Sequence, residues 1–371
     1  MRIGFDAKRA FLNRSGLGSY SRDAIRILAG LQPDNNYFAY SPSKENRTGF
    51  ALPAGCQLRL PQRAISKAFS SYWRSRWIKR DLQNDGIDLY HGLSNEIPVG
   101  LEDCHIRSVV TIHDLIFLLH PEFYKPADRW IYKQKFTYSA HHADLVIAVS
   151  EHTRQDIIRL LKVPEEKVRV VYQGCSPDFR LEPSPDEMER VSQKYQLPAA
   201  YMLCVGTLEK RKNQLALVKA VHKGKLDFPL VFVGRPTGYL QEIKQYVAEN
   251  KLQNIFFLHQ VSGKDLPLVY RGASLFLYPS QVEGFGIPVL EALTAGIPVI
   301  TSAGTSMEEA GGDGSLYIDP SRPEEIAEAM RRLLDNPALV QRMIDAGKMY
   351  ADRFSDEQIA SNLVQLYNSL M

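Results

Sequence analysis

Short apolar runs alternate with amphipathic stretches along the whole chain, and this alternation limits the possible folds more than any other feature of the sequence. Apolar runs of this length predict buried strands, and amphipathic stretches such as Tyr20–Leu31 and Ile131–His141 predict helices between them. The expected strands are Arg2–Asp6, Leu89–His91, Ser108–Ile112, Leu145–Val149, Val168–Val171, Tyr201–Val205, Pro229–Val233, Ile255–Leu258, Ser274–Tyr278 and Pro298–Thr301. This order of elements predicts parallel, doubly wound sheets with helices on both faces.

A polar segment divides this pattern into two halves. Between Pro177 and Pro198 the chain is rich in Pro, Ser and acidic residues, and a new strand is expected directly after it. A chain of 371 residues is also too long for one ordinary hydrophobic core. We therefore predict an α/β protein with two Rossmann-like domains, residues 1–180 and 181–355, followed by a C-terminal helix at residues 356–371.

The composition excludes several classes of protein. Hydrophobic residues make up 44% of the sequence and charged residues 23%, as in ordinary globular proteins. The apolar runs are far shorter than the roughly 20 residues of a membrane span, and Met1–Asp6 enters a strand without a hydrophobic leader. A net charge of +3 does not indicate nucleic-acid binding, and the 4 cysteines have neither metal-binding nor redox spacing. We therefore expect a cytoplasmic protein that binds no metal and no nucleic acid.

Positive charge is concentrated in the first half, above all in the segment Arg63–Arg80. This segment combines basic and aromatic residues and contains no acidic residue, a composition also found in helices that lie on membranes. At helical spacing, one face would carry Ile65, Phe69, Trp73 and Trp77. Lys67 and Arg74 would lie opposite, but two further arginines would fall within the apolar face. Two alternatives stay open: a partly buried helix with a solvated basic face, and peripheral contact with an anionic membrane surface.

The segment from Glu283 to Glu291 places two carboxylates around a glycine-bracketed turn, Glu-Gly-Phe-Gly-Ile-Pro-Val-Leu-Glu. Pro288 suits the first position of a helix, and the glycines before it let backbone amides approach a ligand closely. Unpaired amides at a helix N-terminus attract a diphosphate. Glu283 follows the expected strand Ser274–Tyr278 at its carboxyl end, where open α/β sheets bind ligands. Glu291 is expected on the first helical turn, where an acidic side chain is favourable even without a ligand.

Two adjacent cations, Arg211 and Lys212, follow the first expected strand of the second half and precede a helix. Arg offers a fork of donors and Lys a point charge, and together they can offset the charge of a pyrophosphate. The alternative is a solvated basic helix start, although a cation in a first helical turn is unfavourable unless an anion is bound. The later segment Ser302–Gly312, rich in Gly and Ser, is expected to form a further ligand loop.

The first half offers weaker candidates. Gly16 and Gly18 follow the first expected strand and open a helix, which suits close approach to a phosphate or an acceptor and equally suits a plain tight turn. His113 and Asp114 follow the strand Ser108–Ile112 at its carboxyl end. His113 is either a ligand contact or a structural histidine, and Asp114 either a ligand contact or a turn cap. The glycines lack the G-x-G-x-x-G continuation, so a dinucleotide-dependent dehydrogenase is not expected.

Four motifs of this chain occur together in one enzyme family. They are Thr111-Ile-His-Asp-Leu115, Gly206-Thr-Leu-Glu-Lys-Arg-Lys-Asn213, Tyr278-Pro-Ser280 and Glu283-Gly-Phe-Gly-Ile-Pro-Val-Leu-Glu291-Ala-Leu-Thr-Ala-Gly296-Ile-Pro-Val299. Together they resemble glycosyltransferase family 4, the retaining enzymes of the GT-B fold, over nearly the whole chain. The resemblance implies two Rossmann-like domains facing across a cleft, the first binding the acceptor and the second the nucleotide sugar. It also implies a last helix that crosses back to the first domain.

The resemblance implies roles for individual residues. Glu283 would hold hydroxyls of the donor sugar, and Glu291 would bind the ribose. Arg211 and Lys212 would stabilise the leaving diphosphate, and His113 would contact the transferred sugar. The catalytic candidates are His113, Glu283, Arg211 and Lys212, and the donor-binding candidates are Gly16, Gly18, Thr207, Phe285, Gly286, Ile287 and Glu291.

Two positions depart from the family pattern. Many relatives carry Arg where this chain has Thr207, so charge stabilisation would rest on Arg211 and Lys212. The usual Pro-Glu of the later loop is Glu308-Glu309 here, which makes Glu309 a further candidate.

The resemblance finally implies a retaining, metal-independent hexosyltransferase that uses a nucleotide sugar as donor and needs no cofactor. Relatives of this length resemble bacterial mannosyltransferases of surface polysaccharide and lipopolysaccharide assembly, which favours GDP-mannose as donor. The acceptor would be a saccharide or a lipid-linked saccharide, and the enzyme would work in the cytoplasm or at the inner face of the membrane. The acceptor is expected to attack the sugar from the same face that the leaving phosphate departs from, and no carboxylate of the enzyme is expected to act as a nucleophile.

Two alternatives to sugar transfer remain at this point. One is a sugar-nucleotide epimerase or hydrolase of the same fold. The other is a non-catalytic module that binds a nucleotide sugar. An epimerase would release no free nucleoside diphosphate, and a binding module would turn nothing over.

Overall fold

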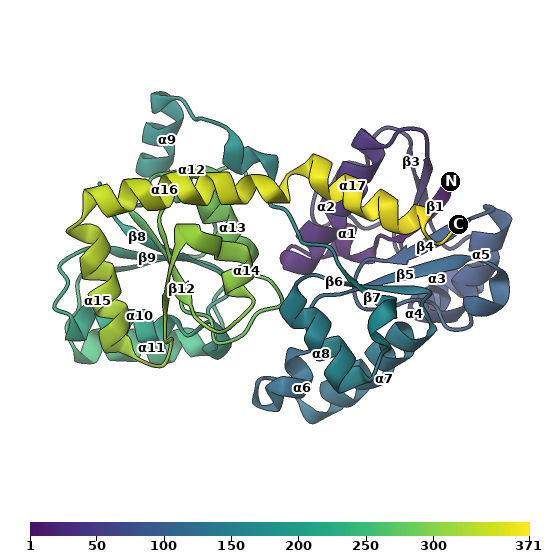
Figure 1. The fold of residues 1–371 in the computed structure, drawn as a ribbon, viewed down its shortest axis with the longest axis horizontal. Coiled ribbons are helices and arrows are strands. Elements are labelled where there is room, and N and C mark those ends of the chain that lie inside the picture. The colour runs from purple at the N-terminus through teal and green to yellow at the C-terminus, as the bar shows by residue number, and fades with distance from the viewer. The chain divides into compact units, whose positions relative to one another are not determined.

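The computed structural model describes the backbone of residues 1–371 and all side chains except that of residue 64. The chain forms two compact units, each built around one parallel sheet with helices packed against it (Figure 1). Met1–Gly174 and Phe354–Met371 form unit 1, and Cys175–Arg353 forms unit 2. The α/β fold class expected from the alternation of strands and helices is confirmed.

Unit 1 contains a seven-stranded parallel sheet in the order β3-β2-β1-β4-β5-β6-β7. Its strands are β1 (Arg2–Asp6), β2 (Asn36–Tyr40), β3 (Cys56–Arg59), β4 (Leu89–Gly92), β5 (Arg107–Ile112), β6 (Leu145–Ala148) and β7 (Val168–Val170). Its helices are α1 (Lys8–Leu12), α2 (Gly16–Leu31), α3 (Ala64–Ala68), α4 (Ser70–Tyr72), α5 (Ile78–Asn84), α6 (Ile116–Leu119), α7 (Pro126–His142), α8 (Glu151–Leu161) and α17 (Asp356–Asn368). The strand order reverses between β1 and β4, the position where sheets of this kind bind ligands.

Buried apolar residues cover both faces of this sheet, as a parallel sheet between two helical layers requires. Val109 and Val110 are neighbours on β5 but belong to different buried clusters, because successive side chains of a strand point to opposite faces. The C-terminal helix α17 packs on α2, and its Tyr367 is fully buried. Arg26 of α2 adds an ion pair of 2.6 Å to Asp356. The last helix is therefore part of unit 1.

Unit 2 contains a six-stranded parallel sheet in the order β10-β9-β8-β11-β12-β13. Its strands are β8 (Met202–Val205), β9 (Leu230–Val233), β10 (Ile255–Leu258), β11 (Leu275–Tyr278), β12 (Val299–Ser302) and β13 (Ser315–Ile318). Its helices are α9 (Pro185–Tyr195), α10 (Gln214–Lys223), α11 (Tyr239–Glu249), α12 (Leu266–Arg271), α13 (Ile287–Thr294), α14 (Met307–Gly311), α15 (Pro323–Leu334) and α16 (Pro337–Ala351). Much of the polar segment 177–198 is helical, because Ser184 and Glu187 form a capping box at the start of α9.

Three strands of the two sheets do not follow from the alternation of apolar runs. β3 and β13 are edge strands whose side chains are mostly exposed or half-buried, so they lack a continuous apolar run. β2, with the sequence Asn-Tyr-Phe-Ala-Tyr, is buried in all but its first residue. Its aromatic composition is typical of strands, and this composition could have predicted β2 from the sequence.

The expectation of one helix over Arg63–Arg80 is wrong. The segment forms α3, α4, a π-helical turn at Trp73–Trp77 and the start of α5, and the backbone at Phe69 leaves the helical region with φ −111° and ψ 50°. The apolar face predicted from uniform spacing is therefore broken: Trp73 is buried, whereas Ile65 is exposed. Among the described residues, no helix is both long and apolar enough to cross a membrane.

Candidate functional site

The candidate residues of unit 2 gather where the strand order of its sheet reverses. Arg211 and Lys212 lie in the loop after β8, and Glu283 lies in the loop after β11. β8 and β11 are hydrogen-bonded neighbours, with Leu275 opposite Met202. The sheet therefore brings three residues that are distant in sequence to one edge, at the position where doubly wound sheets bind ligands.

Glu283 bridges two cations. Its Oε2 lies 2.7 Å from Arg211 Nη1, and its Oε1 lies 2.8 Å from Lys212 Nζ. The hydroxyls of Tyr278 and Ser280 donate hydrogen bonds to Oε1 at 2.8 and 2.9 Å. The side chain of Glu283 is 14% exposed, and those of Arg211 and Lys212 are 17% and 12% exposed. The three charges are therefore largely shielded from water.

Burial and neighbouring charges oppose each other in this cluster. Burial would raise the pKa of Glu283, but Arg211 and Lys212 outweigh it and hold that pKa well below its usual range. Burial would lower the pKa of Arg211, but Glu283 and Glu209 hold it above its usual range. Glu209 Oε1 lies 2.7 Å from Arg211 Nη2. An anionic ligand at this edge would compete with two carboxylates for the cations.

A glycine with positive φ starts the helix beside this cluster. Gly286 has φ 120° and directly precedes Ile287, the first residue of α13. A Cβ at Gly286 would lie 3.3 Å from Cβ of Ala310 and 3.4 Å from Cγ of Met307, so close packing and backbone conformation both call for glycine. Phe285 is buried beside it. The turn places the amides of residues 285–287 at the N-terminal end of α13, which favours negative charge.

The expected position of Glu291 on the first turn of α13 is wrong. The helix begins at Ile287, and no acidic residue lies on its first turn. Attraction to the helix end therefore does not explain Glu291. Instead, its Oε2 accepts a hydrogen bond of 2.7 Å from the hydroxyl of Tyr270.

The two cations do not lie on the first turn of α10, contrary to expectation. Lys210–Lys212 forms a separate 3₁₀ turn, and Asn213 separates it from α10 with a left-handed φ of 56°. The argument against a cation in a first helical turn therefore does not apply. What positions Arg211 is its contact with Glu283 and a 2.7 Å hydrogen bond to the carbonyl of Val282.

Gly206 and Thr207 begin the loop that carries these cations. Gly206 has φ 146°, and a Cβ there would lie 3.0 Å from Cδ of Lys212. The Lys212 side chain therefore packs directly over the backbone of Gly206. The carbonyl of Thr207 accepts a 2.9 Å hydrogen bond from the side chain of Gln214 at the start of α10.

The segment Ser302–Gly312 packs on the same turn. Ser306 donates a 2.7 Å hydrogen bond to the carbonyl of Glu283. The carbonyl of Glu309 accepts a 2.8 Å hydrogen bond from the hydroxyl of Tyr350. This segment therefore helps to hold the backbone of Glu283, a contact that the sequence did not reveal.

The two candidate glycines of unit 1 differ in their surroundings. Gly16 is the first residue of α2, beyond the carboxyl end of β1. A Cβ at Gly18 would lie 1.8 Å from the carbonyl oxygen of Asn13, so packing explains this glycine. A Cβ at Gly16 would meet no atom within 4 Å. Packing therefore does not explain why Gly16 is a glycine.

His113 lies directly after β5, and both of its ring nitrogens are engaged. Nε2–H donates to the carbonyl of Leu93 at 2.9 Å, and Nδ1 accepts from the side-chain amide of Gln173 at 3.0 Å. The backbone N–H of His113 donates to Asn95 Oδ1 at 2.8 Å, and the ring of Tyr20 meets the imidazole edge-on at 4.7 Å. Because a carbonyl only accepts, these contacts fix the neutral Nε2–H tautomer.

Sequence reasoning missed the residues that hold the candidates in place. Gln173 is 60 residues from His113 in the chain, and nothing in a single sequence connects them. Asn95 has a left-handed φ of 65°, which Asn tolerates better than most residues, so an Asn after a strand was a weak available signal. Tyr270 precedes the strand of Glu283 and has no motif of its own.

Two buried histidines predict that unit 1 loses stability in mild acid. Burial lowers the pKa of His113 to about 4 and that of His91 to about 3. An unfolded chain protonates histidine near pH 6.5, so the stability from the neutral rings is complete above that pH and falls as the pH decreases. Each histidine would lower the free energy of unfolding by up to about 1.4 kcal/mol per pH unit below pH 6.5. We therefore expect the temperature at the midpoint of unfolding to decrease when the pH is lowered from 7.5 to 5.

The His91→Gln variant should lose part of this pH dependence. Its matched control is His105→Asn, because His105 is exposed and has the left-handed backbone that Asn accepts. Calorimetric scans of both variants over the same pH range measure the difference. If His91→Gln keeps the full wild-type pH dependence, His91 is not the source of the acid sensitivity.

Comparisons with known proteins decide the family. A model described as Glycosyltransferase Family 4 matches residues 16–179, and one described as Glycosyl transferases group 1 matches residues 186–350. The chain is 33% identical over 391 residues to O-antigen chain mannosyltransferase B of Escherichia coli, with 100% of both chains covered. The chain belongs to glycosyltransferase family 4. The resemblance drawn from the four motifs is thereby confirmed.

Solved structures share the fold of this family 4 glycosyltransferase. Sucrose-phosphate synthase from Thermosynechococcus elongatus matches with a TM-score of 0.81 at 19% identity, covering 100% of this chain and 99% of that one. HepE from Anabaena, solved in complex with UDP-glucose, matches with a TM-score of 0.76 at 17% identity and covers 100% of both chains. At these identities the likeness shows the fold alone, and the GT-B fold is confirmed.

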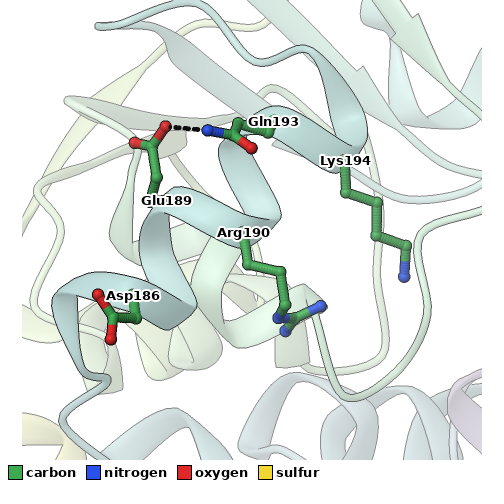
Figure 2. Close-up of a pocket in the computed structure, with 5 residues that line it drawn as sticks. All are labelled: Asp186, Glu189, Arg190, Gln193 and Lys194. Carbon is green, nitrogen blue, oxygen red and sulfur yellow. Dashed lines mark hydrogen bonds between the residues drawn. The ribbon is translucent and has the colours of Figure 1, made fainter.

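One surface hollow of the glycosyltransferase is lined by none of the candidate site residues. It has a volume of about 570 Å³ and is lined by Asp186, Glu189, Arg190, Gln193 and Lys194, all on α9 (Figure 2). Arg190 and Lys194 pair at 2.8 and 2.7 Å with Asp265, whose side chain is 5% exposed. These cations therefore have a structural partner, because they tie α9 to the start of α12.

Arg74 does not belong to a solvated basic face, contrary to the sequence analysis. It pairs with Asp6 at 2.5 Å and with Glu96 at 2.8 Å, and its side chain is 12% exposed. Asp6 ends β1, and Glu96 follows β4. Arg74 therefore anchors its segment at the edge where the strand order of unit 1 reverses. Lys135 of α7 pairs with the same Glu96 at 3.1 Å.

Proposed function

We propose that this family 4 glycosyltransferase transfers mannose from a nucleoside diphosphate sugar to a saccharide acceptor in surface polysaccharide biosynthesis. The observation that carries the proposal is the cluster at the strand reversal of unit 2, where Glu283 holds Arg211 and Lys212. The similarity to O-antigen chain mannosyltransferase B supports the sugar and the class of product. The fold shared with HepE, solved with UDP-glucose, supports a nucleoside diphosphate sugar as donor.

The chemistry of this proposal follows from the negative charge that develops on the leaving group. Breaking the bond between the sugar and the diphosphate places additional negative charge on the departing diphosphate. Preorganised cations stabilise such charge without having to reorganise during the reaction. Arg211 supplies a fork of donors, Lys212 supplies a point charge, and the N-terminal end of α13 adds a partial positive charge. This arrangement supports a mechanism that needs no metal ion.

We further propose that transfer retains the anomeric configuration. The acceptor hydroxyl would attack on the face that the diphosphate leaves, and the departing phosphate would accept its proton. Glu283 would hold hydroxyls of the transferred sugar, and Glu291 would hold the ribose. His113 would contact the transferred sugar in its neutral form and not as an acid, because burial lowers its pKa to about 4. A hydrogen bond from its ring to the sugar would replace the one to Leu93 or the one to Gln173.

A panel of nucleotide sugars tests the donor. A ligand at about 100 times its dissociation constant adds about 2.7 kcal/mol to the free energy of unfolding. We expect GDP-mannose to raise the midpoint of thermal unfolding more than UDP-glucose does. Failure of every nucleotide sugar to stabilise the protein would contradict the proposed function.

Product analysis then separates transfer from its alternatives. Transfer releases GDP and makes an α-linked product from α-linked GDP-mannose. A hydrolase would release free mannose at the same rate with and without acceptor, and an epimerase would release no GDP. A binding module would be stabilised by the donor without any turnover.

Gly16 offers a test of unit 1 that leaves the fold intact. We expect Gly16→Ala to fold like wild type, because its new methyl group meets open space, and to lose about tenfold in transfer, because the methyl group blocks close approach to the ligand. The matched control is Gly30→Ala at the other end of α2, where a Cβ also meets no atom within 4 Å. Equal transfer rates for the two variants would show that Gly16 has no part in ligand binding.

We also propose that the acceptor is lipid-linked and that residues 63–80 contact an anionic membrane surface. The exposed basic, aromatic and large apolar side chains of this segment are Arg63, Ile65, Lys67, Phe69, Tyr72, Arg76, Trp77 and Arg80. Ile65 and Phe69 are 56% and 59% exposed, which is high for large apolar side chains. Aromatic rings favour the membrane interface, and cations near an anionic surface add about 1 kcal/mol each.

Vesicle binding tests this contact with variants chosen from the structure. We expect Lys67→Gln combined with Arg76→Gln and Arg80→Gln to weaken binding to phosphatidylglycerol vesicles roughly a hundredfold at low salt. The matched control replaces the exposed Lys44, Lys162 and Arg169 of the same unit with Gln. Co-sedimentation at low and high salt measures both. If wild type ignores the vesicles even at low salt, or the two triple variants bind equally, the segment is a solvated surface.

A further inference from the structure

A row of buried aromatic rings runs through unit 2 between Glu291 and Glu283. Tyr270 on α12 stacks on Phe276 with ring centroids 5.0 Å apart and planes 25° apart. Phe276 stacks on Tyr278 at 6.1 Å and 17°. Phe276 and Tyr278 are two residues apart on β11, so they project from the same face of the strand. All three rings are at most 2% exposed.

Each end of this row holds one carboxylate. The hydroxyl of Tyr270 donates to Glu291 Oε2 at 2.7 Å, and the hydroxyl of Tyr278 donates to Glu283 Oε1 at 2.8 Å. A tyrosine hydroxyl has one proton to donate, and in both residues it is given to a site glutamate. The hydroxyl of Tyr278 also contacts Lys212 Nζ.

The surroundings keep both hydroxyls protonated and both rings fixed. Burial first, and the adjacent glutamate second, hold the pKa of each tyrosine well above its usual value. Phe179 meets the ring of Tyr270 edge-on, with ring centroids 5.1 Å apart. A stack of rigid rings loses little conformational freedom when it orients a hydrogen bond, unlike a long flexible side chain.

We propose that Tyr270 and Tyr278 are positioning residues of the donor site, which orient Glu291 and Glu283, and that Phe276 sets the spacing between them. This inference rests on the proposed function. Tyr270 acts on recognition of the nucleoside through Glu291. Tyr278 acts on the transferred sugar through Glu283. The stack therefore couples recognition of the two ends of one donor.

Removing single hydroxyl groups tests the two halves separately. Tyr270→Phe should weaken GDP binding about tenfold, which corresponds to about 1.4 kcal/mol, and leave the binding of inorganic pyrophosphate unchanged. Tyr278→Phe should leave GDP binding within about twofold of wild type and slow GDP release from saturating GDP-mannose about tenfold. Calorimetry measures the binding of GDP and of pyrophosphate to both variants, and the rate of GDP release from GDP-mannose measures turnover.

Tyr201 provides the matched control. It is also buried in unit 2, and its hydroxyl donates at 2.7 Å to the carbonyl of Val269 instead of to a glutamate. Tyr201→Phe removes a hydroxyl of the same kind, so it should change neither GDP binding nor turnover by more than about twofold. Phe276→Leu should impair both GDP binding and turnover, because it removes the ring between the two tyrosines.

The outcomes separate this inference from the proposed function. If wild type binds neither GDP nor UDP, the proposed function fails and the inference fails with it. If wild type binds GDP and turns over GDP-mannose but Tyr270→Phe and Tyr278→Phe behave like Tyr201→Phe, the positioning role alone is overturned. The same conclusion follows if both variants lower binding and turnover in equal proportion to a loss of thermal stability.

Discussion

The Glu283→Gln variant will bind GDP at least as tightly as wild type but transfer sugar about a hundredfold to a thousandfold more slowly. The glutamine keeps the shape of the side chain and removes its charge, so Arg211 and Lys212 become more available to a diphosphate. In the proposed mechanism, however, the transferred sugar loses a charged acceptor for its hydroxyls. Calorimetry with GDP and release of GDP from GDP-mannose measure the two effects.

Glutamine is chosen because it keeps a side-chain oxygen that can accept a hydrogen bond from Arg211 or Lys212, whereas alanine does not. Glu283→Ala would remove both the charge and the acceptor atoms from two largely buried cations, and breaking such a pair costs about 3 to 5 kcal/mol. The matched control for both variants is Glu324→Gln, whose carboxylate pairs with Lys223 on the surface and is 67% exposed. Wild-type turnover in Glu283→Gln would remove this residue from the mechanism.

Replacing Lys212 with Met will weaken the binding of GDP about tenfold to a hundredfold and the binding of GMP much less. A point cation acts most strongly on the charge nearest to it, which we assign to the distal phosphate. Lys223→Met is the control, because Lys223 also pairs with a glutamate but is 48% exposed. An equal loss of affinity for GDP and GMP would place Lys212 away from the distal phosphate.

Most strands of both sheets could be predicted from the sequence, including the edge strands β7 and β10, but the interior strand β2 and the edge strands β3 and β13 were not. β5 and β11 are buried on both faces, so they appear as continuous apolar runs. β3 is an edge strand with the sequence Cys-Gln-Leu-Arg, and its pairing with β2 depends on backbone hydrogen bonds that composition does not encode. The break at Phe69 was hidden for a similar reason, since a helical spacing pattern assumes a helix without interruption.

The sequence predicted which loops carry candidate side chains, but not which partners those side chains have. Strand-end positions and glycine turns selected Arg211, Lys212 and Glu283, and the sheet order then places them in contact. Arg74 had the same appearance as its basic neighbours in sequence, yet it is held between two carboxylates and its side chain is only 12% exposed. Gln173 lies far from His113 in the chain. Such pairings depend on tertiary packing, which a local pattern cannot contain.

A crystal structure with GDP bound tests the central claim most directly. The account predicts that diphosphate oxygens lie within about 3.2 Å of Arg211 and Lys212, in place of one or both carboxylate contacts from Glu283. The ribose should lie against Glu291. A diphosphate bound elsewhere, with Arg211 and Lys212 still paired to Glu283, would contradict the account.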